Sequence, residues 1–286
     1  EQRRQSQRER ELLQQFEPQG DSSTPEVLPT KQSTLQLPAN ELPCFRIDKL
    51  VVQSAAGTEA ELNWLRSRAD ETLYGDVDSV EGKCLGISGI SQVVARLQDS
   101  LASEGFITAR VIAESQDIKQ GRLVLTWVPG HVGEIRMADA STSGRPLLTA
   151  APVKAGDRLQ LRAIEQMLEN LRRTPSSDAD VRIEPGKKDN ESDLVVDFRK
   201  TRRLRGEVSA VDSASSATGR YVGGLLIAYD NPLEINDIVY VYLSRALRTG
   251  YVREKGTRSS LLHYSVPYGY WTLTATHGEN AYRQMI

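Results

Sequence analysis

The chain has few of the residues that metal sites, membrane-spanning helices and nucleic-acid surfaces require. Its 286 residues include two cysteines and three histidines, and the histidines lack the spacing of metal ligands, so no metal site is predicted. No run of about 18 apolar residues occurs, which excludes a membrane-spanning helix. It does not exclude transmembrane β-strands, because these are only about 10 residues long and alternate in polarity. A net charge of −2 provides no basic field for nucleic acid.

Motifs for nucleotide binding and for nucleophilic catalysis are incomplete. Gly82-Lys83 would end a phosphate-binding loop, but the preceding glycine is Gly75, and Cys84 stands where a Ser or Thr would hold magnesium. The stretch Gly86–Ile90 has a central serine but lacks the final glycine of a nucleophile elbow. The sequence therefore predicts no catalytic residue, no cofactor and no enzyme activity.

The first 43 residues show no core-forming pattern. Residues 1–16 consist mainly of Gln, Arg and Glu, which are good helix formers, and a helix that is polar all round is solvated or lies in an aqueous lumen. A disordered tail is the alternative. Residues 17–43 hold five of the twelve prolines and are expected to form a linker. Because no apolar signal region follows Glu1, the chain is expected to be either cytosolic or a mature form without its signal peptide.

Residues 44–130 show a periodicity that predicts one strand, two helices and two further strands. The strand is expected at Phe45–Val52 and the first helix at Glu59–Leu73. The second helix has one apolar stripe and ends at Gly105, which accepts the left-handed cap conformation. The last two strands are expected at Ile107–Ala113 and Arg122–Val128. The stripe, which is expected to be core, consists of Ile90, Val93, Val94, Leu97 and Leu101.

The same order of elements is predicted again over residues 131–202. A strand at Val132–Met137 precedes a short helical piece at Pro146–Leu148 and a helix at Arg162–Arg173. Strands at Val181–Ile183 and Leu194–Phe198 complete the unit. Two βααββ units make an α+β fold with an internal repeat of architecture, and each unit can bury one sheet face under its helices.

After residue 203 the helical period is replaced by alternating strands. Tyr221–Tyr229 places Leu225 and Ile227 on one face between terminal tyrosines, which is the outward pattern of a transmembrane strand. Further strands are expected at Gly206–Asp212, Ile238–Leu243, Ser260–Val266 and Tyr270–His277. The smallest outer-membrane barrels need eight strands, so we expect an incomplete barrel; a soluble β-domain is the alternative.

Several short motifs are distinctive: Cys44-Phe45-Arg46-Ile47, Gly105-Phe106-Ile107-Thr108-Ala109-Arg110, Val128-Pro129-Gly130, Thr218-Gly219-Arg220-Tyr221 and Asp230-Asn231-Pro232-Leu233. With them the chain resembles the two-partner secretion transporters of the outer membrane. The resemblance implies a plug helix at 1–16, a linker at 17–43, POTRA 1 at 44–130 and POTRA 2 at 131–202. It also implies that residues 203–286 are the first strands of a transmembrane antiparallel β-barrel, with the plug helix in its lumen.

The resemblance also implies a location and partners. The protein is expected in the outer membrane of a Gram-negative bacterium as a monomer in contact with lipid, with its POTRA domains in the periplasm. It would export one large, unfolded secreted exoprotein: an adhesin, a haemolysin or a contact-dependent toxin. Two alternatives are an assembly factor for other outer-membrane barrels and a soluble periplasmic chaperone or adaptor built from the same modules.

The resemblance further suggests where an unfolded client binds. A three-stranded sheet leaves an unpaired edge to which an extended chain can add a strand, and the family fold places these edges at Ile107–Val111 and Val181–Ile183. Ala109 is expected to present its amide there. The guanidinium of Arg110 is expected to bind client carbonyls or carboxylates, and if the alternation turns Arg110 toward the helices its role is structural instead. The predicted client-binding residues are Ile107, Thr108, Ala109, Arg110, Val111, Val181, Arg182 and Ile183.

Cys44 and Cys84 are the two cysteines of the chain. From the residues alone, two buried free thiols and one disulfide are both open. The periplasm that the resemblance implies is oxidising enough to keep a disulfide, so we expect the bond to form. Closing a loop of this size contributes about 4 kcal/mol in the chain-entropy model.

Overall fold

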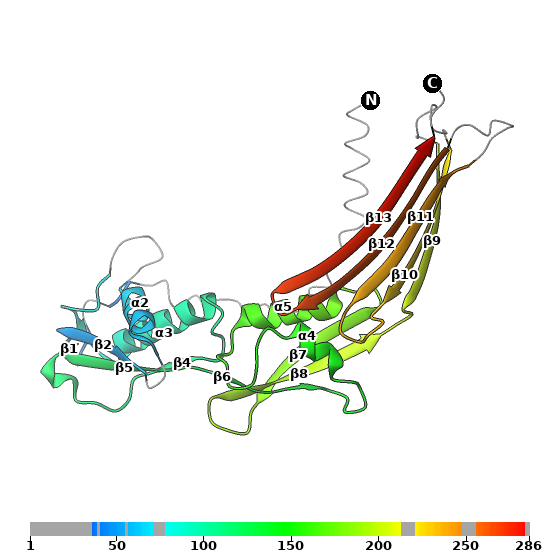
Figure 1. Ribbon diagram of the computed structural model, residues 1–286. Helices are drawn as coiled ribbons and strands as arrows, with labels where there is room; N and C mark the ends of the chain where they lie inside the picture. The colour runs from blue at the N-terminus through cyan, green and yellow to red at the C-terminus, as the bar shows by residue number, and fades with distance from the viewer. Residues whose placement is uncertain are drawn as a thin grey trace.

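The computed structural model of the chain describes residues 36–38, 41–54, 57–70, 78–212, 221–247 and 256–283. Figure 1 shows three bodies in a row: a first α+β module, a second α+β module and a curved antiparallel sheet. The expected plug helix at 1–16 and most of the expected linker lie outside the described residues. Within the described ranges, none of the helices has both the length and the apolar character that crossing a membrane demands.

The first module, residues 44–130, is a three-stranded sheet covered by two helices. The strand order is β2-β5-β4, with β2 and β5 parallel and β4 antiparallel to β5, so β4 forms one edge. The elements are β1 Phe45–Arg46, β2 Lys49–Gln53, α2 Glu59–Ala69, β3 Cys84–Leu85, α3 Ile87–Ser103, β4 Arg110–Ile112, the 3₁₀ helix Ile118–Gln120 and β5 Arg122–Val128.

The apolar stripe of α3 forms the centre of the first core, as predicted. Val93, Leu97 and Leu101 are fully buried and pack in one cluster with alternate residues of β5. The helix ends just before Gly105, whose φ of 91° is the left-handed conformation that a glycine adopts without strain.

The predicted strand Phe45–Val52 is in fact two strands in two sheets. Its first part, β1, pairs with β3, whereas its second part, β2, pairs with β5. The chain changes partner at Asp48, whose N–H donates to the carbonyl oxygen of Gly121, as does the N–H of Lys49. The alternation breaks at this junction, because Asp48 and Lys49 are both polar and exposed and the buried positions shift from Ile47 to Leu50.

The predicted strand Ile107–Ala113 is also longer than the observed one. β4 contains only Arg110–Ile112, because Ile107 and Thr108 lie in a turn. The N–H of Ala109 closes this turn by donating to the carbonyl oxygen of Phe106 at 3.2 Å. The expectation that Ala109 presents its amide on the sheet edge is therefore wrong.

The first predicted helix ends earlier than the periodicity indicated. α2 ends at Ala69, and Leu73 lies outside the described residues. The start of α2 is fixed by a capping box in which Thr58 and Glu61 each accept a backbone N–H of the other.

The second module, residues 131–202, repeats this topology. Its sheet has the order β6-β8-β7, with β6 parallel and β7 antiparallel to the central β8, so β7 is an edge strand like β4. The predicted βααββ repeat is confirmed. The elements are β6 His131–Met137, α4 Arg145–Ala150, α5 Leu161–Arg172, β7 Ser177–Pro185 and β8 Glu191–Lys200.

The C-terminal sheet consists of five antiparallel strands joined in sequence order. These are β9 Leu204–Val211, β10 Val222–Asp230, β11 Ile238–Ala246, β12 Gly256–Tyr268 and β13 Trp271–Arg283. All five predicted strands are present, each with somewhat different ends. Among the described residues β9 and β13 do not pair with each other, so the sheet is open at both sides.

The two faces of the C-terminal sheet differ in polarity along its central strands. On one face Ile227 lies opposite Val241, which in turn lies opposite Leu262, and all three side chains are exposed. On the other face Tyr240 stacks on His263 at 4.5 Å between ring centroids, and His263 hydrogen-bonds Thr276. An apolar outer band with a polar inner face is the arrangement of a transmembrane barrel.

Candidate client-binding site

The outer edge of β4 consists of the main-chain N–H and C=O groups that point away from β5. The Val111 N–H donates to the side chain of Gln98 at 3.1 Å, so the main-chain groups of Val111 point away from β5, in the plane of the sheet. Main-chain groups alternate along an antiparallel strand, so Arg110 and Ile112 pair with β5. The Ala109 and Val111 side chains are buried toward the helices, whereas the Arg110 side chain is exposed.

β7 presents the corresponding edge in the second module. The Ala179 carbonyl oxygen accepts from Arg172 Nε on α5 at 2.6 Å, and the Ala179 N–H donates to Asp178 Oδ1 at 2.9 Å. The main-chain groups of Ala179 therefore point away from β8. Because main-chain groups alternate in direction along a strand, those of Val181 and Ile183 point to the same outer edge. The Ile183 side chain is 40% exposed.

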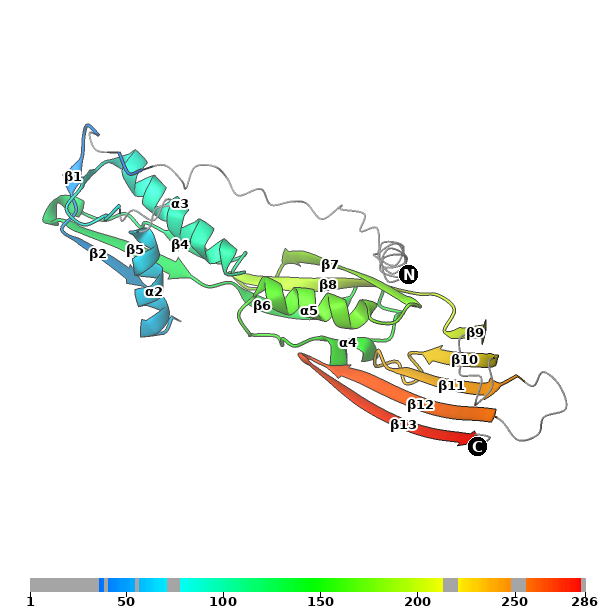
Figure 2. The ribbon, with the colours of Figure 1, turned by 90° about the horizontal axis from the view of Figure 1, so that it is seen from above.

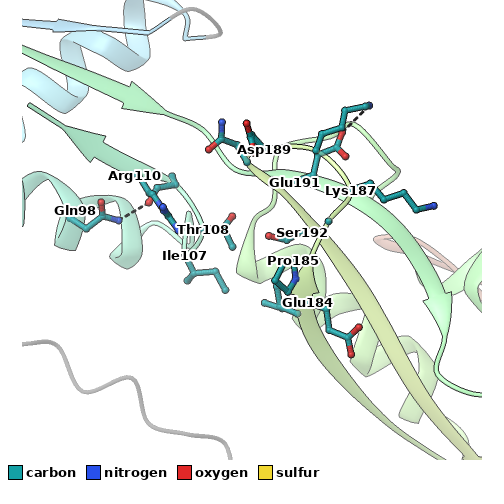
Figure 3. A pocket seen from close by; sticks show the side chains of 15 residues that line it. Gln98, Ile107, Thr108, Arg110, Glu184, Pro185, Lys187, Asp189, Glu191 and Ser192 are labelled. Atoms are coloured by element: carbon teal, nitrogen blue, oxygen red, sulfur yellow. Dashed lines mark hydrogen bonds and ion pairs between the residues drawn. The ribbon is translucent and has the colours of Figure 1, made fainter. Parts of the chain in front are cut away.

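These two edges meet at one cavity of about 990 Å³ between the modules. Figure 3 shows Ile107 and Arg110 of the first module on one side, and Glu184 and Ser192 of the second module on the other. Five of the predicted client-binding residues line this cavity, namely Ile107, Thr108, Ala109, Arg110 and Ile183. Val111, Val181 and Arg182 do not line it.

The cavity carries charges of both signs, most of them already paired. Lys188 binds Glu191 at 3.1 Å, Glu184 binds Arg136 at 3.0 Å, and Lys187 binds a carboxylate of the neighbouring strand β6. Among the described residues no carboxylate is paired with Arg110, which lies on the wall of the cavity. Its planar guanidinium is placed to donate to carbonyls or a carboxylate of a bound chain.

Arg158 of the second module contacts two residues of the first module and so joins the modules. Its guanidinium forms an ion pair with Glu61 and lies over the Trp127 ring, 5.3 Å from the centroid. Burial opposes ionisation of Glu61, but hydrogen bonds from Arg158 and Thr58 outweigh it and lower the pKa of this carboxyl to about 2. The Leu161 N–H also donates to the Gly105 carbonyl oxygen at 2.8 Å, so α5 begins directly on the end of α3.

Part of the segment expected to be a linker packs on the first module. Leu37 is buried in the first core, and the Glu41 carboxylate accepts from the Gly86 and Gly89 N–H groups at the start of α3. These bonds lower the pKa of Glu41 against the opposing effect of its burial. Cys44 and Cys84 are joined in a disulfide, with their Cα atoms 5.3 Å apart.

The second module is clamped to the C-terminal sheet by side chains that the sequence analysis did not single out. Asn236, in the turn between β10 and β11, donates to the Pro146 carbonyl oxygen of α4 at 2.8 Å. Asn170 donates to the Gly269 carbonyl oxygen at the turn between β12 and β13 at 2.7 Å, and Arg173 reaches Ser265 at 2.9 Å. The only sequence signal was the concentration of Asn and Asp in this turn.

Three family models match the chain in the same order as the observed bodies. The POTRA domain of ShlB type matches residues 58–130, a second POTRA domain model matches 131–185, and the haemolysin secretion/activation protein family ShlB/FhaC/HecB matches 190–286.

Named relatives and solved structures agree with these matches. The outer membrane transporter CdiB-2 of Burkholderia pseudomallei is 33% identical over 251 residues, which is 86% of this chain and 43% of the relative. The hemolysin transporter protein HpmB of Proteus mirabilis is 24% identical over 79% of this chain and 37% of its own. The structure of CdiB from Acinetobacter baumannii superposes with a TM-score of 0.74 at 26% identity, covering 98% of this chain and 52% of that one.

Fold and matches together define two POTRA domains followed by strands of the type found in outer-membrane transporters. More narrowly, the chain belongs to the family of two-partner secretion transporters and contains the two POTRA domains and the following barrel strands. The family places the protein in the outer membrane of Gram-negative bacteria. The relatives named above are transporters, not enzymes. The chain spans less than half the length of these curated relatives.

Proposed function

We propose that this protein recognises an unfolded, large secreted exoprotein in the periplasm through its two POTRA domains. It then passes the exoprotein across the outer membrane through the barrel to which β9–β13 belong. The observation that carries this proposal is the convergence of two outward-facing strand edges, β4 and β7, on one cavity. This function is favoured over barrel assembly and over a soluble chaperone, because the relatives are named transporters and the C-terminal sheet has an apolar outer band.

Recognition through strand edges suits a client that has no folded surface. An extended chain that adds to β7 forms main-chain hydrogen bonds with Val181 and Ile183, and these bonds do not depend on the client's side chains. Arg110 then binds carbonyls or carboxylates of the same chain where it crosses the cavity. No step in this binding requires a nucleotide or another cofactor.

The clamp at Asn236 provides a direct route from recognition to transport. It joins α4 of the second module to the turn between β10 and β11, so the module is held against one end of the sheet. The polar face of the sheet, with Tyr240, His263 and Thr276, would line the path of the client. We infer that the protein acts as a monomer embedded in outer-membrane lipid.

The client is a large exoprotein of the adhesin, haemolysin or contact-dependent toxin classes. Site-specific photo-crosslinking in secreting cells tests this function. A photoreactive residue in place of Ile107 or Ile183 is expected to capture the exoprotein. Matched exposed positions outside the cavity, Ile87 and Leu148, are expected to capture none. Capture at Ile87 and Leu148 but not at the cavity positions would contradict the proposal.

A further inference from the structure

A side chain of the first module already occupies the free edge of β4. Gln98 on α3 donates from Nε2 to the Ala109 carbonyl oxygen at 2.7 Å and accepts the Val111 N–H at Oε1 at 3.1 Å. Figure 3 shows this side chain reaching across to the start of β4. A carboxamide has the same donor and acceptor as a peptide group. Gln98 therefore makes the two hydrogen bonds that one residue of an added parallel strand would make with this edge.

The edge of β7 is covered differently. At Ala179 its main-chain groups are bound by Arg172 and Asp178. At Val181 and Ile183 no side chain of the described residues hydrogen-bonds the outward main-chain groups. At the cavity, therefore, the outward main-chain groups of β7 are available to a client, whereas those of β4 are already bound by Gln98.

We propose that Gln98 competes with the client strand for the β4 edge. The client can pair with β4 only after the Gln98 carboxamide has released the main-chain groups of Ala109 and Val111. This inference rests on the proposed function. An uncovered edge is a template for any extended chain, including a second copy of this protein. Gln98 lowers the affinity of the β4 edge for all such chains, so a client already held on β7 and in the cavity has the advantage of proximity.

The test compares Gln98→Ala with the wild-type protein in detergent. The probe is the large exoprotein that this protein secretes under the proposed function, kept unfolded in dilute urea. The variant is expected to bind it with roughly fivefold to a hundredfold lower Kd, the factor for two ordinary intramolecular hydrogen bonds that no longer have to be broken. Without the probe, the Val111 amide is expected to exchange hydrogen faster in the variant. Gln98→Met, which keeps the length of the side chain without its hydrogen bonds, is expected to behave like Gln98→Ala.

Gln116 provides a matched control. Its carboxamide makes the same pair of bonds with the Val124 N–H and carbonyl oxygen of β5, both at 2.7 Å, but it does not line the cavity. Gln116→Ala is expected to leave the Kd unchanged. An unchanged or higher Kd in both Gln98 variants, with wild-type binding intact, overturns the role of Gln98 alone. Absence of binding by the wild-type protein overturns the proposed function, and the inference with it.

Discussion

The burial of some side chains could be predicted from the sequence pattern, whereas the orientation and partners of others could not. Val93 and Leu97 were predicted as core because a long helix repeats its apolar stripe several times, and both are fully buried. The orientation of Arg110 was left open, because β4 is only three residues long and contains too few residues to define an alternation. The partners of Gln98 and Arg158 lie on other elements or in the other module, so no local pattern predicts them.

The Glu61–Arg158 pair predicts a dependence of stability on pH. The pKa of Glu61 is lowered to about 2 from its ordinary value of 4.5, so the stabilisation is complete above pH 4.5 and is lost as the pH falls toward 2. Glu61→Gln removes the charge but keeps the reciprocal cap with Thr58. Between pH 4.5 and 2, the melting temperature of the wild type is expected to fall more steeply than that of Glu61→Gln. Parallel curves would show that the pair contributes nothing.

The Cys44–Cys84 bond is expected in the mature protein isolated from the periplasm or outer membrane. Mass spectrometry without reduction should find the two cysteines in one cross-linked peptide pair. Replacing both by serine is expected to lower the free energy of unfolding of the first module by about 2–4 kcal/mol. Two free thiols in the isolated protein would refute the bond.

At the scale of elements, the sequence predicts which helices and strands exist better than it predicts where they end. Every predicted strand is represented, yet Phe45–Val52 divides between two sheets and β4 begins three residues late. The first division coincides with two consecutive polar residues, Asp48 and Lys49, whose N–H groups bind the distant Gly121. The late start of β4 arises from the turn that the Ala109 N–H closes on Phe106, which overrides the local apolar pattern. The contact of Leu37 with the first core was hidden for a related reason, because its neighbours are polar and rich in proline.

The edge of β7 can be tested with two substitutions at one position. Ile183→Pro removes an outward main-chain donor, while the neighbouring residues keep their pairing with β8. Ile183→Ala removes the side chain and keeps the donor. Secretion and client binding are expected to fall severalfold in Ile183→Pro and to change little in Ile183→Ala, with unchanged circular dichroism in both. Equal loss in the two variants would assign binding to the side chain and not to the strand edge.

The clamp between the second module and the sheet is tested at Asn236. Its φ is 62°, and its amide binds the Pro146 carbonyl oxygen. Asn236→Gly removes the amide alone, whereas Asn236→Ala also forces an L side chain into the left-handed conformation at a further cost of about 1 kcal/mol. Hydrogen exchange of the α4 amides is expected to accelerate in the order wild type, Asn236→Gly, Asn236→Ala. Identical exchange in all three proteins would contradict the clamp.

At the scale of the whole molecule, the three bodies form one connected path. Figure 2 shows the first module, the second module and the C-terminal sheet following one another. The disulfide and Glu41 fix the start of the first module, Arg158 joins the first module to the second, and Asn236 joins the second module to the sheet. The sequence predicted the order of the bodies from their periodicities and the family from short motifs. It could not predict the cavity, because residues of both modules line it and the modules are held together by contacts between residues far apart in sequence, such as Arg158 with Glu61 and Leu161 with Gly105.

Hydrogen–deuterium exchange of the whole protein, with and without its unfolded exoprotein, tests the central claim most directly. If the client adds as a strand on both sides of the cavity, exchange slows in peptides covering Ile107–Ile112 and Val181–Pro185. Peptides covering α2 and β6 then serve as internal references and exchange at unchanged rates. Protection confined to α2 or β6, with none at the two edges, would contradict the account.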